Sequence, residues 1–216
     1  MIAASTLYQI EARVRAALRD PTPRSAVHAA LAPRPRRGWR AGVIPTSSRR
    51  AAALVLLYPV ERQVHLVLTR RAGTLGQHAG QVSLPGGAVD EHETIIAAAL
   101  REAHEEVGIV SDVVRVLGIL TALYIPVSNF ALHPVIGVSD ERPRLVPAAA
   151  EVAHILEVPL EELQDQTRQR RGWAWRGTEL VEVPYFELQS ERVWGATAMV
   201  LGEVLHLMGT PVSHVP

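Results

Sequence analysis

Carboxylates gather in one short stretch of the chain, at a spacing that could perform chemistry. Residues 87–109 read Gly-x5-Glu-x7-Arg-Glu-Ala-x-Glu-Glu-x-Gly-Ile, and the acidic positions are Glu93, Glu102, Glu105 and Glu106. Residues on a helix advance about 100° each, so the last three fall within a sector of roughly 100°. Three carboxylates so close together repel one another, and divalent cations bound through oxygen relieve that repulsion.

The neighbouring residues would hold such a helix in place. Arg101 can pair with Glu105 one turn later, and it lies two turns after Glu93, so it could tie the preceding loop to the helix. The pair Gly86-Gly87 lets the backbone approach closely and offers the Gly86 carbonyl as a further ligand. Three glutamates alone would fit a solvated helix face better, and only the whole pattern favours a site. An adjacent apolar face would pack on a sheet: Ile96, Leu100, Ala103 and Val107.

A diphosphate is the kind of substrate that this cluster suits. Its hydrolysis requires that dense negative charge be neutralised and that a water molecule be aligned, and bound metals do both. A carboxylate outside the helix often completes such a site as ligand or base. Glu151 is the candidate because it immediately precedes an expected strand beside the helix, although a surface glutamate at a strand start explains it equally well.

Composition limits the class of protein. The 216 residues are 48% hydrophobic and 20% charged, as expected for one soluble domain with a real core. Cysteine is absent, which excludes disulfides and thiolate chemistry. The longest apolar run, residues 51–60, is too short to span a bilayer, and the first residues do not resemble a signal peptide. We therefore expect a cytoplasmic protein.

Charge is distributed unevenly, although the net charge is zero. All 22 basic residues are arginine, and ten of them lie in residues 1–50 against Glu11 and Asp20, an excess of eight. A basic arm could bind nucleic acid or an anionic membrane. A solvated arginine-rich helix is the favoured interpretation, since only Tyr8 and Trp39 there could stack on bases. We expect neither a nucleic-acid nor a membrane partner, and leave a homodimer open.

The remaining pattern predicts alternating strands and helices, which favours a mixed sheet between helices. Residues 1–48 are expected to form a helix, ended by Pro21, and a linker rich in Pro and Arg, followed by one domain over residues 49–216. Expected strands are 51–58, 64–69, 81–84, 113–123, 132–138 and 152–158, with a hairpin at 173–175 and 180–186. Expected helices in that domain are 94–107, 160–166 and 196–208.

The pattern of residues 87–109 resembles the signature of the Nudix hydrolases at every fixed position. That resemblance implies an α/β fold, an α/β/α sandwich with a mixed sheet, and hydrolysis of nucleoside diphosphates linked to another group with Mg²⁺ or Mn²⁺. By position, Glu102, Glu105 and Glu106 would be metal ligands, and Arg101 with Glu93 a supporting ion pair.

Residues 67–72 and 80–87 resemble the coenzyme A pyrophosphatase branch of that family. Positions in register are Thr69, Arg71, Gly80, Val82 and Pro85-Gly86-Gly87, and residues 158–163, 183–186 and 194–198 are also similar. The resemblance implies cleavage of coenzyme A, or a derivative, to 3′,5′-ADP and a 4′-phosphopantetheine product. Arg70 and Arg71 would then bind phosphate, although surface charge at a strand end fits them as well.

Some features leave the substrate open. Gly76 stands where the branch usually carries arginine, which predicts weaker phosphate binding. Another substrate, such as ADP-ribose or NADH, is the alternative. A non-catalytic nucleotide-binding module is disfavoured because such modules usually lose carboxylates that are all present here. Trp194 could stack on a base, but packing beneath the last helix is favoured.

Overall fold

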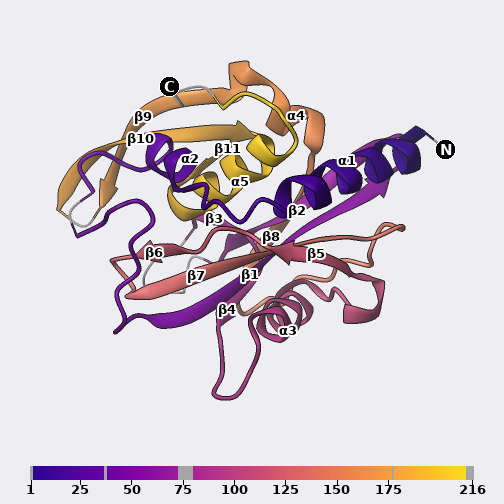
Figure 1. The fold of residues 1–216 in the computed structure, drawn as a ribbon, viewed down its shortest axis with the longest axis horizontal. Coiled ribbons are helices and arrows are strands. Elements are labelled where there is room, and N and C mark those ends of the chain that lie inside the picture. The colour runs from indigo at the N-terminus through magenta and orange to yellow at the C-terminus, as the bar shows by residue number, and fades with distance from the viewer. Residues whose placement is uncertain (1, 37, 73–79, 177, 213–216) are drawn as a thin grey trace.

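The computed structural model describes residues 2–36, 38–72, 80–176 and 178–212, and it consists of a mixed sheet with helices on both faces (Figure 1). The helices are α1 (Ile2–Leu18), α2 (Ser25–Ala30), α3 (Ile95–Val107), α4 (Leu160–Gln164) and α5 (Gly195–Leu207). The strands are β1 (Arg49–Val60), β2 (Gln63–Arg71), β3 (Val82–Ser83), β4 (Gly86–Ala88), β5 (Arg115–Ile119), β6 (Leu123–Ile125), β7 (Phe130–Val138), β8 (Val152–Pro159), β9 (Gln169–Arg176), β10 (Glu179–Leu188) and β11 (Glu191–Trp194).

The main sheet has the order β3-β2-β1-β7-β5, with β4 paired to β1, β6 to β7 and β8 to β2. Strands β1 and β7 run parallel, whereas β1 is antiparallel to β2 and β4, so the sheet is mixed as predicted. Strands β9, β10 and β11 form a separate antiparallel sheet. The expected hairpin is its β9–β10 part.

Strand β1 is apolar and buried from Ala51 to Tyr58 because both of its faces are covered there. Val55 and Leu57 pack into a core with α1 and α5, whereas Leu54 and Leu56 pack into a second core with α3. Successive side chains of a strand point to opposite faces, so a strand buried on both sides has a continuous apolar sequence. Among the described residues, no helix is long and apolar enough to cross a membrane.

Helix α3 begins and ends at residues suited to those positions. The Thr94 hydroxyl accepts a hydrogen bond from the Ala97 amide at 3.1 Å, and Gly108 adopts the left-handed conformation at φ 74°. The packed face differs from the prediction at one position: Ile96 is exposed. The face that contacts the sheet is instead formed by small side chains, which let the helix approach β1 closely: Ala98, Ala99, Ala103 and Val107.

The N-terminal segment is part of the fold rather than a free arm. Leu7, Ile10 and Val14 of α1 are buried in the core that includes α5. Arg115 of β5 donates to Glu11 at 2.9 Å, which attaches the polar side of α1 to the sheet. The boundary expected at residue 48 stays a prediction.

The strand expected over residues 113–123 is wrong in its extent. The chain forms a 3₁₀ turn at Ser111–Val113, then β5 and β6 as two strands. The β5–β7 register shifts between Val116 and Gly118, which interrupts the alternation on which the prediction depended. Helix α4 also ends two residues earlier than predicted, before a 3₁₀ turn at Gln166–Arg168.

Candidate active site

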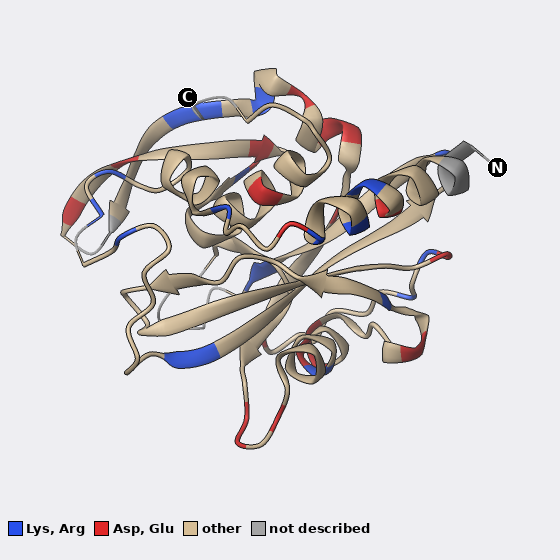
Figure 2. Cartoon of the chain, in the orientation of Figure 1, with Lys and Arg blue, Asp and Glu red and all other residues tan. Residues whose placement is uncertain are grey.

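Arg101 joins the loop after β4 to helix α3. Its guanidinium donates two hydrogen bonds to Glu93, from Nε to Oε1 at 3.0 Å and from Nη2 to Oε2 at 3.1 Å, and a third to the Ala88 carbonyl at 3.0 Å. The hydrogen bond from Arg101 lowers the pKa of Glu93. Figure 2 shows acidic residues on this loop and on α3. The expected Arg101–Glu93 ion pair is therefore present and fixes the loop on the helix.

The same guanidinium reaches two of the clustered carboxylates. Arg101 Nη1 lies 2.9 Å from Glu102 Oε1 and 3.1 Å from Glu105 Oε2. Glu105 is exposed, whereas Glu102 is partly buried against β4. A Cβ atom at Gly87 would collide with the Glu102 carboxyl group, so a larger residue there would displace this carboxyl group from β4. Burial raises the pKa of Glu102, with a further increase from Glu105, and Arg101 opposes both.

Glu106 is a buried carboxylate with few partners. Its side chain is 4% exposed. Oε2 accepts a hydrogen bond from the Gly86 amide at 3.3 Å, and Oε1 lies 3.8 Å from Arg71 Nη1. Burial raises the pKa of Glu106 to about 7, because these two partners offset the lost hydration only in part, and Glu102 adds to the increase. Glu106 therefore carries a charge that the protein itself does not fully compensate.

Glu151 lies near this cluster although it belongs to another part of the chain. It is exposed at the start of β8, and its carbonyl accepts a hydrogen bond from the Ala72 amide at 2.8 Å. Its charge contributes to raising the pKa of both Glu102 and Glu106. The structure thus brings the candidate base and the helix carboxylates together, while its role stays a prediction.

The donor set of this cluster suits a hard divalent cation. Its side chains offer oxygen only, and Glu106 gains most from a positive charge because it is buried with a raised pKa. Within the described part of the chain, no three acidic or histidine side chains are already arranged around a cation position. Arg101 engages Glu102 and Glu105, so a cation shared by these two carboxylates and Glu106 would compete with the guanidinium for them.

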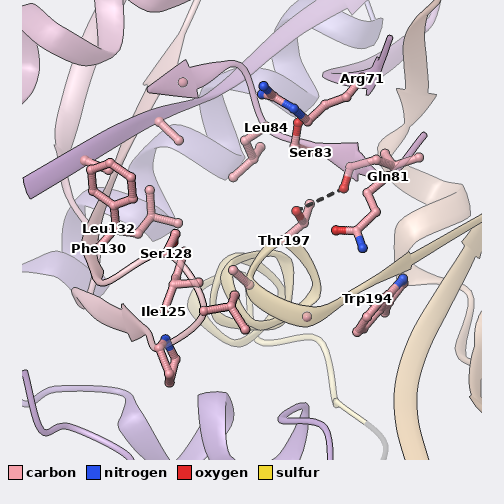
Figure 3. Close-up of a pocket in the computed structure, with 18 of the residues that line it drawn as sticks. Arg71, Gln81, Ser83, Leu84, Ile125, Ser128, Phe130, Leu132, Trp194 and Thr197 are labelled. Carbon is pink, nitrogen blue, oxygen red and sulfur yellow. Dashed lines mark hydrogen bonds between the residues drawn. The ribbon is translucent and has the colours of Figure 1, made fainter. Parts of the chain in front are cut away.

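A cavity of about 950 Å³ adjoins the cluster (Figure 3). Strand β4 is common to both, because Gly86 and Gly87 line the cavity and also contact Glu106 and Glu102. One side of the cavity is polar and carries Arg71, Gln81 and Ser83. The other side is apolar: Ile125, Phe130 and Leu132. The volume is within the usual range for small-molecule sites.

The two adjacent arginines of β2 have different surroundings. Arg71 lines the cavity and faces Glu106, whereas Arg70 is more exposed and forms an ion pair with Glu191 of β11 at 2.9 Å. The β2–β8 register shifts between these two residues. Arg70 is not among the described residues that line the cavity. Gly76, the departure from the expected arginine, lies outside the described residues.

Several cavity residues were not predicted from the sequence. Gln81 and Ser83 stand on either side of Val82, and the alternation of an extended chain could have indicated that they share a face. Arg36 lines the cavity from the N-terminal segment, where no sequence pattern pointed to it. Trp194 is only partly buried and lines the cavity, in contrast to the packing favoured from sequence (Figure 3).

Comparison with known proteins places this geometry in a family. Residues 48–179, more than half of the chain, match the family model described as NUDIX domain, and the chain belongs to the Nudix hydrolases. Members of this family are diphosphatases that act on small nucleotide diphosphates and typically use a divalent metal.

Two curated relatives and one solved structure are similar to this chain. A relative in Pectobacterium atrosepticum is 38% identical over 161 residues, which cover 74% of this chain and 83% of the relative. One in Cronobacter sakazakii is 40% identical over 172 residues, which cover 76% and 84%. Both are described as an uncharacterized Nudix hydrolase, NudL. The crystal structure of RenU, a Nudix hydrolase from M. smegmatis, has a TM-score of 0.55 at 23% identity, over 82% of this chain and 98% of RenU, and shares the fold.

Proposed function

We propose that this protein hydrolyses the diphosphate bond of coenzyme A, or of a coenzyme A derivative, with Mg²⁺ or Mn²⁺. The products are 3′,5′-ADP and a 4′-phosphopantetheine compound. One observation carries the proposal: Arg71 of β2 and Val82 of β3, two positions at which the chain resembles the coenzyme A pyrophosphatase branch, line the cavity beside the carboxylates.

The chain's own residues divide the work of the reaction. Glu102, Glu105, Glu106 and the Gly86 carbonyl would hold the cation, which when bound neutralises diphosphate charge and acidifies a water molecule. Arg71 is placed to bind a diphosphate oxygen, since it lines the cavity next to Glu106. Arg101 and Glu93 hold the loop and helix together.

Hydrolysis replaces one bond to the bridging oxygen of the diphosphate with a bond to the oxygen of water. Water attacks one phosphorus atom, the bond from that phosphorus to the bridging oxygen breaks, and the bridging oxygen leaves with the other phosphate. Glu151 is proposed to accept a proton from the water molecule. Its charge contributes to raising the pKa of Glu102 and of Glu106, and its exposed position allows proton exchange with solvent.

Another nucleoside diphosphate, such as ADP-ribose or NADH, is the second candidate substrate. The observation in its favour is Gly76, which stands where the coenzyme A branch usually carries a phosphate-binding arginine. A non-catalytic role is disfavoured because all the carboxylates of the family pattern are present.

A substrate panel tests the proposal. Purified protein is incubated with Mg²⁺ or Mn²⁺ and coenzyme A, dephospho-coenzyme A, ADP-ribose or NADH, and the products are identified by mass spectrometry. We expect the highest kcat/KM for coenzyme A, with 3′,5′-ADP as a product. Faster cleavage of ADP-ribose or NADH would contradict the substrate assignment and leave the family assignment intact.

A further inference from the structure

The cavity has a wall that does not come from the matched family domain. Pro33 and Arg36 line it, although the domain match begins at residue 48. The segment that carries them is attached to β10: the Arg34 amide donates to the Glu182 carbonyl at 2.8 Å, and the Glu182 amide donates to the Arg34 carbonyl at 2.9 Å. The N-terminal segment therefore forms part of the cavity wall and is held there by hydrogen bonds to β10.

The Arg36 guanidinium is positioned by contacts from three sides. Its Cζ lies 4.6 Å from the centre of the Trp39 ring. Its Nη1 lies 2.8 Å from Met199 Sδ on α5, and its Nη2 lies 3.4 Å from the Tyr124 carbonyl on β6. The side chain is partly buried, so a charge-assisted hydrogen bond formed there is stronger than one in open solvent.

Arg36 and Arg71 lie on opposite flanks of the central strand. Arg71 belongs to β2 on one side of β1, whereas Arg36 contacts β6, which pairs with β7 on the other side. Arg71 faces Glu106, so it lies at the end of the cavity next to the carboxylates. Arg36 consequently provides a second cationic position, away from the bond that the carboxylates would cleave.

We propose that Arg36 binds a phosphate monoester of the substrate, and thereby selects coenzyme A over dephospho-coenzyme A. The inference rests on the proposed function, because the 3′-phosphate is the anionic group of coenzyme A that does not take part in the reaction. A phosphate monoester carries nearly two negative charges and matches the planar donors of a guanidinium. Arg70, a phosphate-binding candidate from sequence, is engaged by Glu191 instead.

Equilibrium binding without metal tests this role separately from catalysis. The dissociation constants of 3′,5′-ADP and 5′-AMP are measured by calorimetry in EDTA for the parent, Arg36→Gln and Arg34→Gln. We expect Arg36→Gln to weaken 3′,5′-ADP binding about tenfold or more, which corresponds to about 1.4 kcal/mol, and to leave 5′-AMP binding unchanged. Arg34 is exposed and absent from the described cavity lining, so Arg34→Gln should change neither constant.

A second variant and a kinetic measurement complete the test. Arg36→Lys keeps the charge but not the planar donors, and should give an intermediate loss even where Arg36→Gln folds poorly. With Mg²⁺, either variant should reduce kcat/KM for coenzyme A more than for dephospho-coenzyme A. Equal losses for both ligands of a pair, or no loss, would overturn the role of Arg36. Failure of the parent to cleave coenzyme A, with the 3′,5′-ADP result as expected, would overturn the proposed function alone.

Discussion

Among the residues that the structure describes, two glutamates are buried, and their surroundings differ. Glu203 of α5 is fully buried: His28 Nε2 donates to its Oε2 at 2.8 Å, and the Thr121 amide and hydroxyl donate to its Oε1 at 3.0 and 2.8 Å. Burial alone would raise the pKa of Glu203, but these hydrogen bonds outweigh it and the pKa is lowered. Glu106 has one amide donor at 3.3 Å and a raised pKa of about 7.

The difference distinguishes a structural carboxylate from one that is free to act. The partners of Glu203 come from α2 and from the segment between β5 and β6, so its charge holds α5 to the rest of the fold. Glu106 contacts Gly86 and lies close to Arg71, two residues that line the cavity, and its charge is only partly compensated, so it is available to a cation. The first predictions below remove the charge of one glutamate in each environment, and the last compares two arginines near Glu106.

The largest effect is expected from Glu203→Ala. Removing this carboxylate leaves buried His28 and the Thr121 amide without their partner, and breaking a buried pair typically costs about 3–5 kcal/mol. For a chain of this size that corresponds to a fall in melting temperature of roughly 10 °C. Thermal unfolding followed by circular dichroism measures it. A melting temperature within one or two degrees of the parent would show that the network contributes little.

Glu106→Gln should have its effect on activity rather than on folding. The substitution removes one strong electrostatic contribution to the reaction, and such losses typically lower kcat about 10²–10³-fold. Glu91, on the loop before α3 and 90% exposed, provides the matched control Glu91→Gln, which should retain the parent's rate. Steady-state hydrolysis with Mg²⁺ compares the three proteins. Near-full activity of Glu106→Gln would disprove its assignment as a metal ligand.

The two glutamates should affect stability with opposite dependence on pH. The pKa of Glu106 is raised in the folded state, so its contribution is present below about pH 4.5 and is lost as the pH rises through about 7. At about 1.4 kcal/mol per pKa unit, the metal-free parent should lose about 3 kcal/mol relative to Glu106→Gln between pH 4.5 and 8. Melting curves in EDTA measure this.

The lowered pKa of Glu203 predicts the reverse sign. Its contribution is present above its unfolded pKa and is lost as the pH falls through the folded value, so Glu203→Ala should differ least from the parent in acid. Parallel pH profiles for both variants would refute the contrast between the two environments.

The smallest effects are expected for the two adjacent arginines of β2, Arg70 and Arg71. Arg71→Gln removes a cavity guanidinium and should raise KM, by the equivalent of about 1.5–3 kcal/mol for a hydrogen bond to a charged group. Arg70→Gln removes an exposed ion pair with Glu191 and should change KM and stability by less than about 1 kcal/mol. Michaelis–Menten analysis of both variants separates them. Equal changes in KM would show that both arginines contact substrate.

Much of this arrangement could be predicted because it depends on local sequence. The ends of α3 follow from Thr94 and Gly108, and the Arg101–Glu93 contact follows from helix spacing across a short loop. The mixed sheet follows from apolar runs separated by turns. The resemblance to the Nudix signature supplied the family.

The rest depends on contacts between distant segments. Arg70 and Arg71 are neighbours on β2 and point to opposite faces, but which of them faces Glu106 depends on how β2 is placed relative to α3, and the sequence of one strand does not reveal that placement. Arg36 reaches the cavity because Arg34 pairs with Glu182, almost 150 residues later in the chain. His28 and Glu203 are similarly far apart, and neither stands in a recognisable motif.

The most direct test of the central claim is Mn²⁺ binding to the full-length protein at pH 7, measured by calorimetry in two buffers that differ in ionisation enthalpy. Because the pKa of Glu106 is raised to about 7, part of this carboxyl group is protonated at pH 7, so binding should release a fraction of a proton. We predict that Glu106→Gln abolishes this release and weakens Mn²⁺ binding at least tenfold, whereas Glu91→Gln matches the parent. Unchanged Mn²⁺ affinity in Glu106→Gln would contradict the account.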